Sequence, residues 1–66
     1  MRKIEKQFLK EVSQELTPLH IIGERVNMDF KTAEKFMKYL EKHDELRYTT
    51  EIISGQEMYL VAKTIN

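Results

Sequence analysis

The sequence predicts a small, mainly α-helical domain in which three helices are followed by a β-hairpin. Two observations lead to this expectation. Up to residue 43, apolar residues recur every three or four positions, which is the spacing of one face of an α-helix. After Asp44 the pattern changes to β-branched and aromatic residues on either side of a Ser54–Gly55 turn signal. With 66 residues and no cysteine, the chain is expected to form a single domain, 1–66, around one core.

The first helix is expected to span residues 3–16. Five apolar residues share one face of this segment at helical spacing: Ile4, Phe8, Leu9, Val12 and Leu16. This face predicts a helix that packs on the core and carries no chemistry. Pro18 cannot continue the helix but suits the first turn of a new one, so we expect Thr17 to cap a second helix.

The second helix is expected over residues 18–26. Gly23 lies inside it, where glycine costs roughly 0.5–1 kcal/mol relative to alanine. This cost is tolerated most readily where another backbone approaches, so we expect the second and third helices to cross closely at Gly23. Asn27 enters the left-handed region at low cost and can end the second helix. Asp29 can then cap the third helix by accepting from a free amide of its first turn.

The third helix, expected over residues 30–43, has two opposed faces. Its apolar face contains Ala33, Phe36, Met37 and Leu40. On the far side, within roughly 60° of one another, lie four lysines: Lys31, Lys35, Lys38 and Lys42. Such a row is suited to lying against phosphates, although any surface helix turns its charges away from the core. The formal net charge of zero argues against strong non-specific binding of nucleic acid.

The hairpin is expected over residues 46–63. If Ser54 and Gly55 are the two turn residues, five residues face one side, which we take as inward: Leu46, Tyr48, Ile52, Tyr59 and Val61. A turn longer by one residue would exchange the faces of one strand. In either register apolar groups remain on both faces. We therefore expect a homodimer that covers the surplus, which includes Ile53, Met58 and Leu60.

This order of helices, corner and hairpin resembles the winged helix–turn–helix family of DNA-binding domains, in the form of a small prokaryotic, archaeal or viral regulator. The resemblance covers residues 4–63. The matching consensus positions are the small or turn residues Gly23, Asn27 and Ala33, the apolar residues Ile22, Val26, Met28, Met37 and Leu40, and the cap Asp29 with Thr32. Asp44 and Asn27 replace common glycines. The wing carries Glu51 and Glu57, although the family often places Arg or Lys there.

The resemblance implies sequence-specific binding of double-stranded DNA by a transcriptional regulator, with the third helix in the major groove. The candidate DNA-binding residues are Lys31, Thr32, Lys35 and, at the margin, Glu34 for base edges, Lys38, Lys42 and Arg25 for the phosphate backbone, and Ser54, Gly55 and Gln56 at the wing tip. Phe30 also lies near the base edges, but we expect it to pack on the corner beside Met28.

A protein-interaction module that does not bind DNA is the alternative, because the net charge is zero, the wing is acidic and the strands carry surplus apolar residues. An enzyme is not expected. No glycine-rich phosphate loop is present, and His20 and His43 are isolated, so we expect no catalytic residue, metal, cofactor or small-molecule substrate. The lack of cysteine and of any apolar run near the ~20 residues of a membrane span predicts a cytoplasmic protein.

Overall fold

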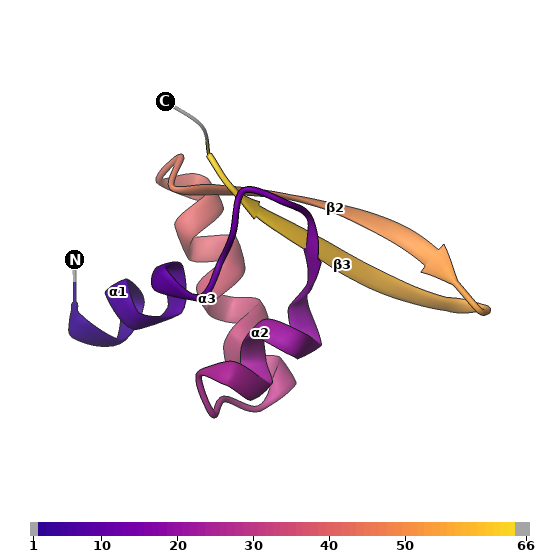
Figure 1. Cartoon of the computed structure of the whole chain (residues 1–66), viewed down its shortest axis with the longest axis horizontal. Helices are drawn as coiled ribbons and strands as arrows, with labels where there is room; N and C mark the ends of the chain where they lie inside the picture. Colours follow the sequence, from indigo (N-terminus) through magenta and orange to yellow (C-terminus); the bar gives the residue numbers. More distant parts are fainter. Residues whose placement is uncertain (1, 65–66) are drawn as a thin grey trace.

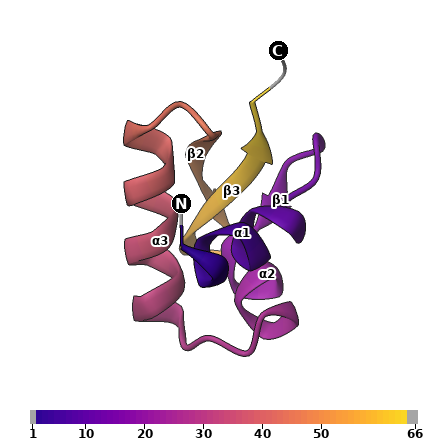
Figure 2. The same cartoon turned by 90° about the vertical axis from the view of Figure 1, so that its left-hand side faces the viewer.

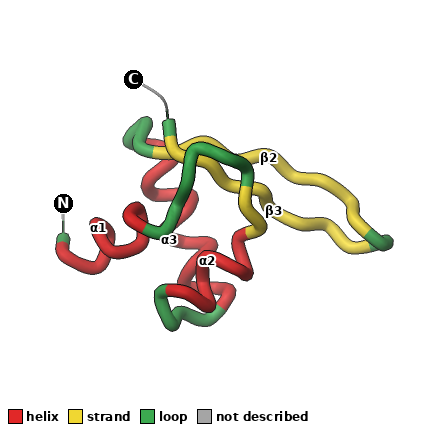
Figure 3. Tube along the Cα trace, in the orientation of Figure 1, coloured by secondary structure: helices red, strands yellow, loops and turns green. Residues whose placement is uncertain are grey.

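The computed structural model describes residues 2–64, which form three helices and a three-stranded antiparallel sheet. In chain order the elements are α1 (Lys3–Lys10), β1 (Thr17–Pro18), α2 (Leu19–Arg25), α3 (Phe30–Lys42), β2 (Leu46–Ile53) and β3 (Gln56–Lys63). The strand order is β1-β3-β2, so β3 is the central strand. The three helices gather at one end, and the β2–β3 hairpin projects away from them (Figure 1). The fold therefore mixes α and β structure, with a third strand that the sequence did not predict (Figure 3).

The first helix is shorter than expected. It ends at Lys10, and the chain then turns to run beside the central strand β3. The Ser13 carbonyl accepts from the Lys63 amide at 2.7 Å. The two residues of β1 continue this contact, since Thr17 pairs with Val61 and Pro18 with Leu60. Pairing with β3 satisfies backbone groups that a longer helix would leave without partners along the central strand.

The early end of α1 changes which of its apolar residues are buried. Phe8, Leu9 and Val12 belong to the core, as predicted. Ile4 and Leu16 are each 44% exposed, so the prediction that both belong to the core stripe is wrong. Leu16 lies in the loop before β1, where it no longer shares a helical face with the others.

The corner between α2 and α3 has the geometry that its sequence predicts. A Cβ added at Gly23 would lie 3.3 Å from the Met28 carbonyl oxygen and 3.5 Å from the Ala33 Cβ, which confirms the close approach of the two helices. Asn27 has a φ of 58° and ends the turn. Helix α2 starts at Leu19, one residue later than expected. Pro18, not Thr17, occupies its N-cap position, and no side chain caps it.

Helix α3 begins where predicted and ends one residue earlier, at Lys42. The Asp29 carboxylate accepts from the Thr32 amide at 2.9 Å, which confirms the expected cap. The same hydrogen bond holds the pKa of Asp29 below its usual value. At the other end, Asp44 has a φ of 59°, and the Glu45 amide donates to the Leu40 carbonyl at 3.0 Å.

The hairpin has a two-residue turn. Ser54 and Gly55 have φ values of 53° and 79°, as a type I′ turn requires. The register pairs Tyr48 with Val61, which confirms the predicted parity. Leu46 and Val61 are buried on the inward side, whereas Ile52 on the same side is 77% exposed because it lies on the projecting part of the hairpin. Strand β3 starts at Gln56, directly after the turn.

One core joins all three helices to the base of the hairpin. Its buried residues are Phe8, Leu9, Val12, Leu19, Ile22, Ala33, Met37, Leu40, Leu46 and Val61. Phe36 packs against this core, with its ring centroid 6.0 Å from that of Phe8. Helix α3 stands along one side of the molecule, with α1 and α2 grouped beside it (Figure 2). Within residues 2–64, none of the helices combines the length and apolar character needed to cross a membrane.

Candidate nucleic-acid interface

The four lysines of α3 form a single exposed row, here called the lysine strip: Lys31, Lys35, Lys38 and Lys42. The buried residues Ala33, Met37 and Leu40 lie on the opposite side of the helix. Because successive residues are about 100° apart, burial of that side directs the lysine strip straight outward. The helix thus presents ammonium groups over most of its length, and the core fixes the direction in which they point.

Glu34 borders the lysine strip and has two partners. Its carboxylate accepts from the Tyr59 hydroxyl at 2.7 Å. The same carboxylate oxygen lies 3.7 Å from the Lys38 ammonium nitrogen. Among the residues that the structure describes, the other three lysines of the strip form no ion pair. Glu34 is therefore oriented toward the hairpin, and its surface contact with Lys38 leaves all four ammonium groups of the strip exposed.

Tyr59 joins α3 to the hairpin. Its hydrogen bond to Glu34 raises the pKa of the phenol above its usual value, and partial burial acts in the same direction. The Phe30 ring is stacked on the Tyr59 ring with centroids 6.3 Å apart, and Tyr48 meets Tyr59 edge-on at 5.5 Å. Phe30 is 49% exposed and lies against this aromatic group on the hairpin side of α3. This group sets the position of the hairpin beside the helix.

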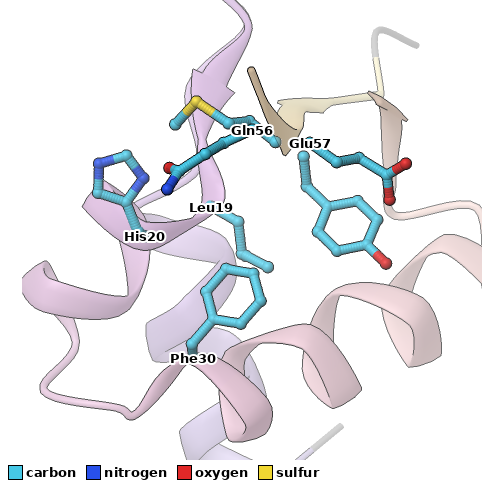
Figure 4. Close-up of a pocket in the computed structure, with 7 residues that line it drawn as sticks. Leu19, His20, Phe30, Gln56 and Glu57 are labelled. Atoms are coloured by element: carbon cyan, nitrogen blue, oxygen red, sulfur yellow. The ribbon is translucent and has the colours of Figure 1, made fainter. Parts of the chain in front are cut away.

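A hollow of about 380 Å³ lies between the start of α2, the start of α3 and the outer part of β3. Seven residues line it: Leu19, His20, Phe30, Gln56, Glu57, Met58 and Tyr59. In Figure 4 the Gln56 amide lies near the His20 ring, and the Phe30 ring faces the same space. The hollow combines aromatic surface with polar groups from three separate segments, and no local sequence pattern predicted it.

The structure groups only some of the predicted DNA-binding residues. Thr32 is half-buried and lines a second hollow, of about 330 Å³, together with Lys35, beside the N-terminal end of α1. Ser54 and Gly55 are exposed at the far end of the hairpin, and Gln56 reaches back to the first hollow. Arg25 lies apart, because it lines a hollow between α1 and α2. The structure therefore groups the predicted residues of α3 on one helix, while the turn residues Ser54 and Gly55 lie apart from them at the hairpin tip (Figure 1).

Neither histidine takes part in a cluster of metal ligands. Within residues 2–64, no three His, Asp or Glu side chains gather in a way that would hold a metal ion. His20 lines the first hollow, and His43 lies at the end of α3 with its ring 4.5 Å from that of Tyr39. Cation-binding chemistry thus gives no functional lead in the described part of the chain, and the candidate surface is defined by its lysines.

Comparison with known proteins adds no relative from which a function can be transferred. A scan against protein-family models, a search of curated proteins and a search of solved structures all found no match. A functional assignment must therefore be argued from the residues of this chain.

Proposed function

We propose that this protein binds double-stranded DNA with α3 in the major groove, as a small transcriptional regulator of the winged helix–turn–helix type. The observation that supports this most directly is the lysine strip, which lies opposite the buried side of a 13-residue helix. The major groove is wide enough to admit an α-helix. The close corner at Gly23 and the hairpin beside α3 support the same orientation, because both leave the outward side of the helix uncovered.

The lysines divide into two roles in this proposal. Lys31 and Lys35, nearer the N-terminal end of α3, reach base edges, where lysine donates to the acceptors of guanine. Lys38 and Lys42 lie further along the helix and bind phosphate, which fixes the register of the protein on DNA. Glu34 serves to hold Tyr59 and to moderate Lys38, since its carboxylate already accepts from the Tyr59 hydroxyl. In this proposal the base-reading role therefore belongs to the lysines and not to Glu34.

The hairpin sets a limit on the strength of binding. Glu51 and Glu57 are both exposed on it and would repel a DNA backbone. Contact by the hairpin is therefore assigned to the turn, through Ser54, the Gly55 amide and Gln56. With Lys38 and Lys42 on phosphate, the slope of log K against log salt concentration should be about −2, since each neutralised phosphate contributes roughly −0.9.

The salt dependence of binding tests the proposal. Fluorescence anisotropy with a labelled duplex, selected from a random-sequence library, measures affinity across a series of salt concentrations. Lys38→Ala and Lys42→Ala should each weaken binding and reduce the slope by about 0.9, whereas Lys31→Ala and Lys35→Ala should weaken binding to the selected duplex and relax its base preference. Lys6→Ala, at an exposed position on α1, is the matched control and should leave both quantities unchanged. An unaltered slope in Lys38→Ala and Lys42→Ala, together with unaltered affinity in Lys31→Ala and Lys35→Ala, would show that this helix does not contact DNA.

A protein-interaction module is the second candidate, because the hairpin exposes aliphatic side chains. Ile52 is 77% exposed and Ile53 is 42% exposed, and both lie next to the turn. Successive strand residues point to opposite faces, so each face of the projecting hairpin carries one of these exposed apolar side chains, which another chain could cover. This function would be favoured if the library yielded no duplex that the protein binds, while hairpin variants abolished capture of a protein partner.

A further inference from the structure

The outer edge of β2 is an open strand edge. Because the strand order is β1-β3-β2, β2 pairs with another strand on one side only. It pairs with β3 over eight consecutive residues without a bulge, and its sequence contains neither proline nor lysine. Proteins that stay monomeric usually protect such edges with short strands, bulges, proline or lysine. Figure 1 shows the hairpin projecting beyond the helices, so no helix covers the outer part of this edge.

The hairpin register shows which backbone groups point outward. The pair Ile53 and Gln56 closes the two-residue turn, so these residues exchange backbone hydrogen bonds. Hydrogen-bonded and non-hydrogen-bonded pairs then alternate along the ladder. The amide and carbonyl groups of Tyr48 and Thr50 therefore face away from β3. Within the described residues, no backbone group outside the hairpin hydrogen-bonds to them.

The charges on β2 are complementary to the same strand reversed. Arg47 and Glu51 are its only charged residues, and both are exposed. In an antiparallel pairing of two copies of β2 centred on Thr49, Arg47 of each copy lies opposite Glu51 of the other. Tyr48 then lies opposite Thr50, so the outward backbone groups meet in hydrogen-bonded pairs. Backbone parity allows this register, and the charges of Arg47 and Glu51 select it among the registers that parity allows.

We propose that a second copy of this chain binds here, through antiparallel pairing of the two β2 strands centred on Thr49. The pairing joins the two sheets into one and forms two Arg47–Glu51 ion pairs across the interface. In this register Ile52, which is 77% exposed, comes opposite position 46 of the second copy, where the leucine is already buried in its own core. The sequence predicted a dimer that covers Ile53, Met58 and Leu60, and of these Ile53 is 42% exposed while the other two are half-buried in the single chain. The β2 edge is independent of the lysine strip and does not depend on DNA binding.

Charge reversal tests this register specifically. Sedimentation of the full chain at high micromolar concentration should give the mass of two chains. Arg47→Glu and Glu51→Arg should each weaken self-association by about tenfold or more, because two attractive pairs become repulsive. An equimolar mixture of the two variants should associate again, since every Glu then faces an Arg. Glu57→Arg, on the central strand β3, is the control and should self-associate as the wild type does.

Hydrogen exchange supplies a second measurement that does not use variants. The Tyr48 and Thr50 amides should become protected as protein concentration rises, while protection of the Thr49 amide, which pairs within the hairpin, should not change. A single-chain mass at all concentrations would overturn the proposal. So would a dimer that both single charge reversals leave intact, because its contacts would then lie elsewhere.

Discussion

The two halves of the hairpin share one pattern of residues but differ in burial. Near the helices, Leu46 and Val61 are almost fully buried on the inward side. Towards the turn, Ile52 lies on that same side of the same strand and is 77% exposed. Strand alternation therefore determines only the side to which a residue points. Burial depends on whether another element covers that side, and the helices of this protein cover only the base of the hairpin.

The two halves of the hairpin are expected to have different roles, one in stability and the other in contacts with other molecules. The inner half belongs to the core and should determine the free energy of unfolding. The outer half buries little within one chain, so its apolar residues should contribute to contacts with another molecule. Variants placed on matched positions of the two halves test this separation.

The largest effect is expected from truncating the same side of β2 in its two halves. Leu46→Ala should lower the free energy of unfolding by about 2–5 kcal/mol, because it leaves a cavity in the core. Ile52→Ala should change it by no more than about 0.5 kcal/mol. Urea unfolding followed by circular dichroism measures both, at a protein concentration low enough to suppress self-association. Equal losses in the two variants would contradict the separation of the two halves.

A smaller effect is expected at the turn, where backbone conformation alone matters. A Cβ at Gly55 would meet nothing within 4 Å, but its φ of 79° is strained for an L-residue. Gly55→Ala should therefore destabilise the hairpin by about 1–2 kcal/mol. Gly55→Asn should cost less, because asparagine tolerates this region. Hydrogen exchange at the Gln56 amide reports the local loss, and identical exchange in both variants would exclude this explanation.

The smallest effect is expected at the junction of the two halves, where Tyr59 donates to Glu34. Tyr59→Phe should cost about 0.5–1.5 kcal/mol, the net value of one hydrogen bond. The raised pKa of Tyr59 also predicts a pH dependence. This contribution is complete below the usual tyrosine pKa of about 10 and is lost as pH rises through the higher folded-state value.

Urea unfolding between neutral and alkaline pH tests this sign. The wild type should lose its advantage over Tyr59→Phe as the phenol ionises, so the two curves should converge above about pH 10. If the difference in free energy of unfolding between the two proteins stays constant across this range, the Tyr59 hydroxyl does not stabilise the fold by donating to Glu34.

The sequence predicted the parts of the fold that depend on neighbouring residues. Asp29 caps α3, Asn27 enters the left-handed region and Ser54–Gly55 closes the hairpin. Each of these signals acts within about four residues, so a local pattern is sufficient. The hairpin parity followed from the turn length for the same reason.

The end of α1 and the formation of β1 were not predicted, because their cause lies far along the chain. Apolar spacing continues to Leu16, and no proline or glycine interrupts it before Pro18. The helix nevertheless stops at Lys10, and the chain pairs with residues near Val61. Pairing with β3 accounts for this change, and the Ser13 hydroxyl supports it locally, because it accepts from the Glu15 amide at 3.2 Å and so competes with helical hydrogen bonding.

The candidate site likewise contains features that a local pattern predicts and features that depend on distant residues. Helical periodicity alone predicted the lysine strip, and the structure shows all four side chains exposed. The contact between Glu34 and Tyr59 joins residues 25 positions apart, so sequence reasoning left Glu34 as a base-reading candidate. The hollow beside Phe30 likewise combines three distant segments. DNA binding itself stays a prediction for the salt series to test.

The opposite border of the sheet has a consequence for how large an assembly can grow. Strand β1 contains only two residues, and one of them is Pro18, which has no amide hydrogen to donate. A further strand has almost nothing to join there. A further strand can therefore be added only at the β2 edge. When two chains pair through their β2 edges about a twofold axis, neither chain keeps an open β2 edge. Association of this kind ends at a pair and cannot propagate into a fibre.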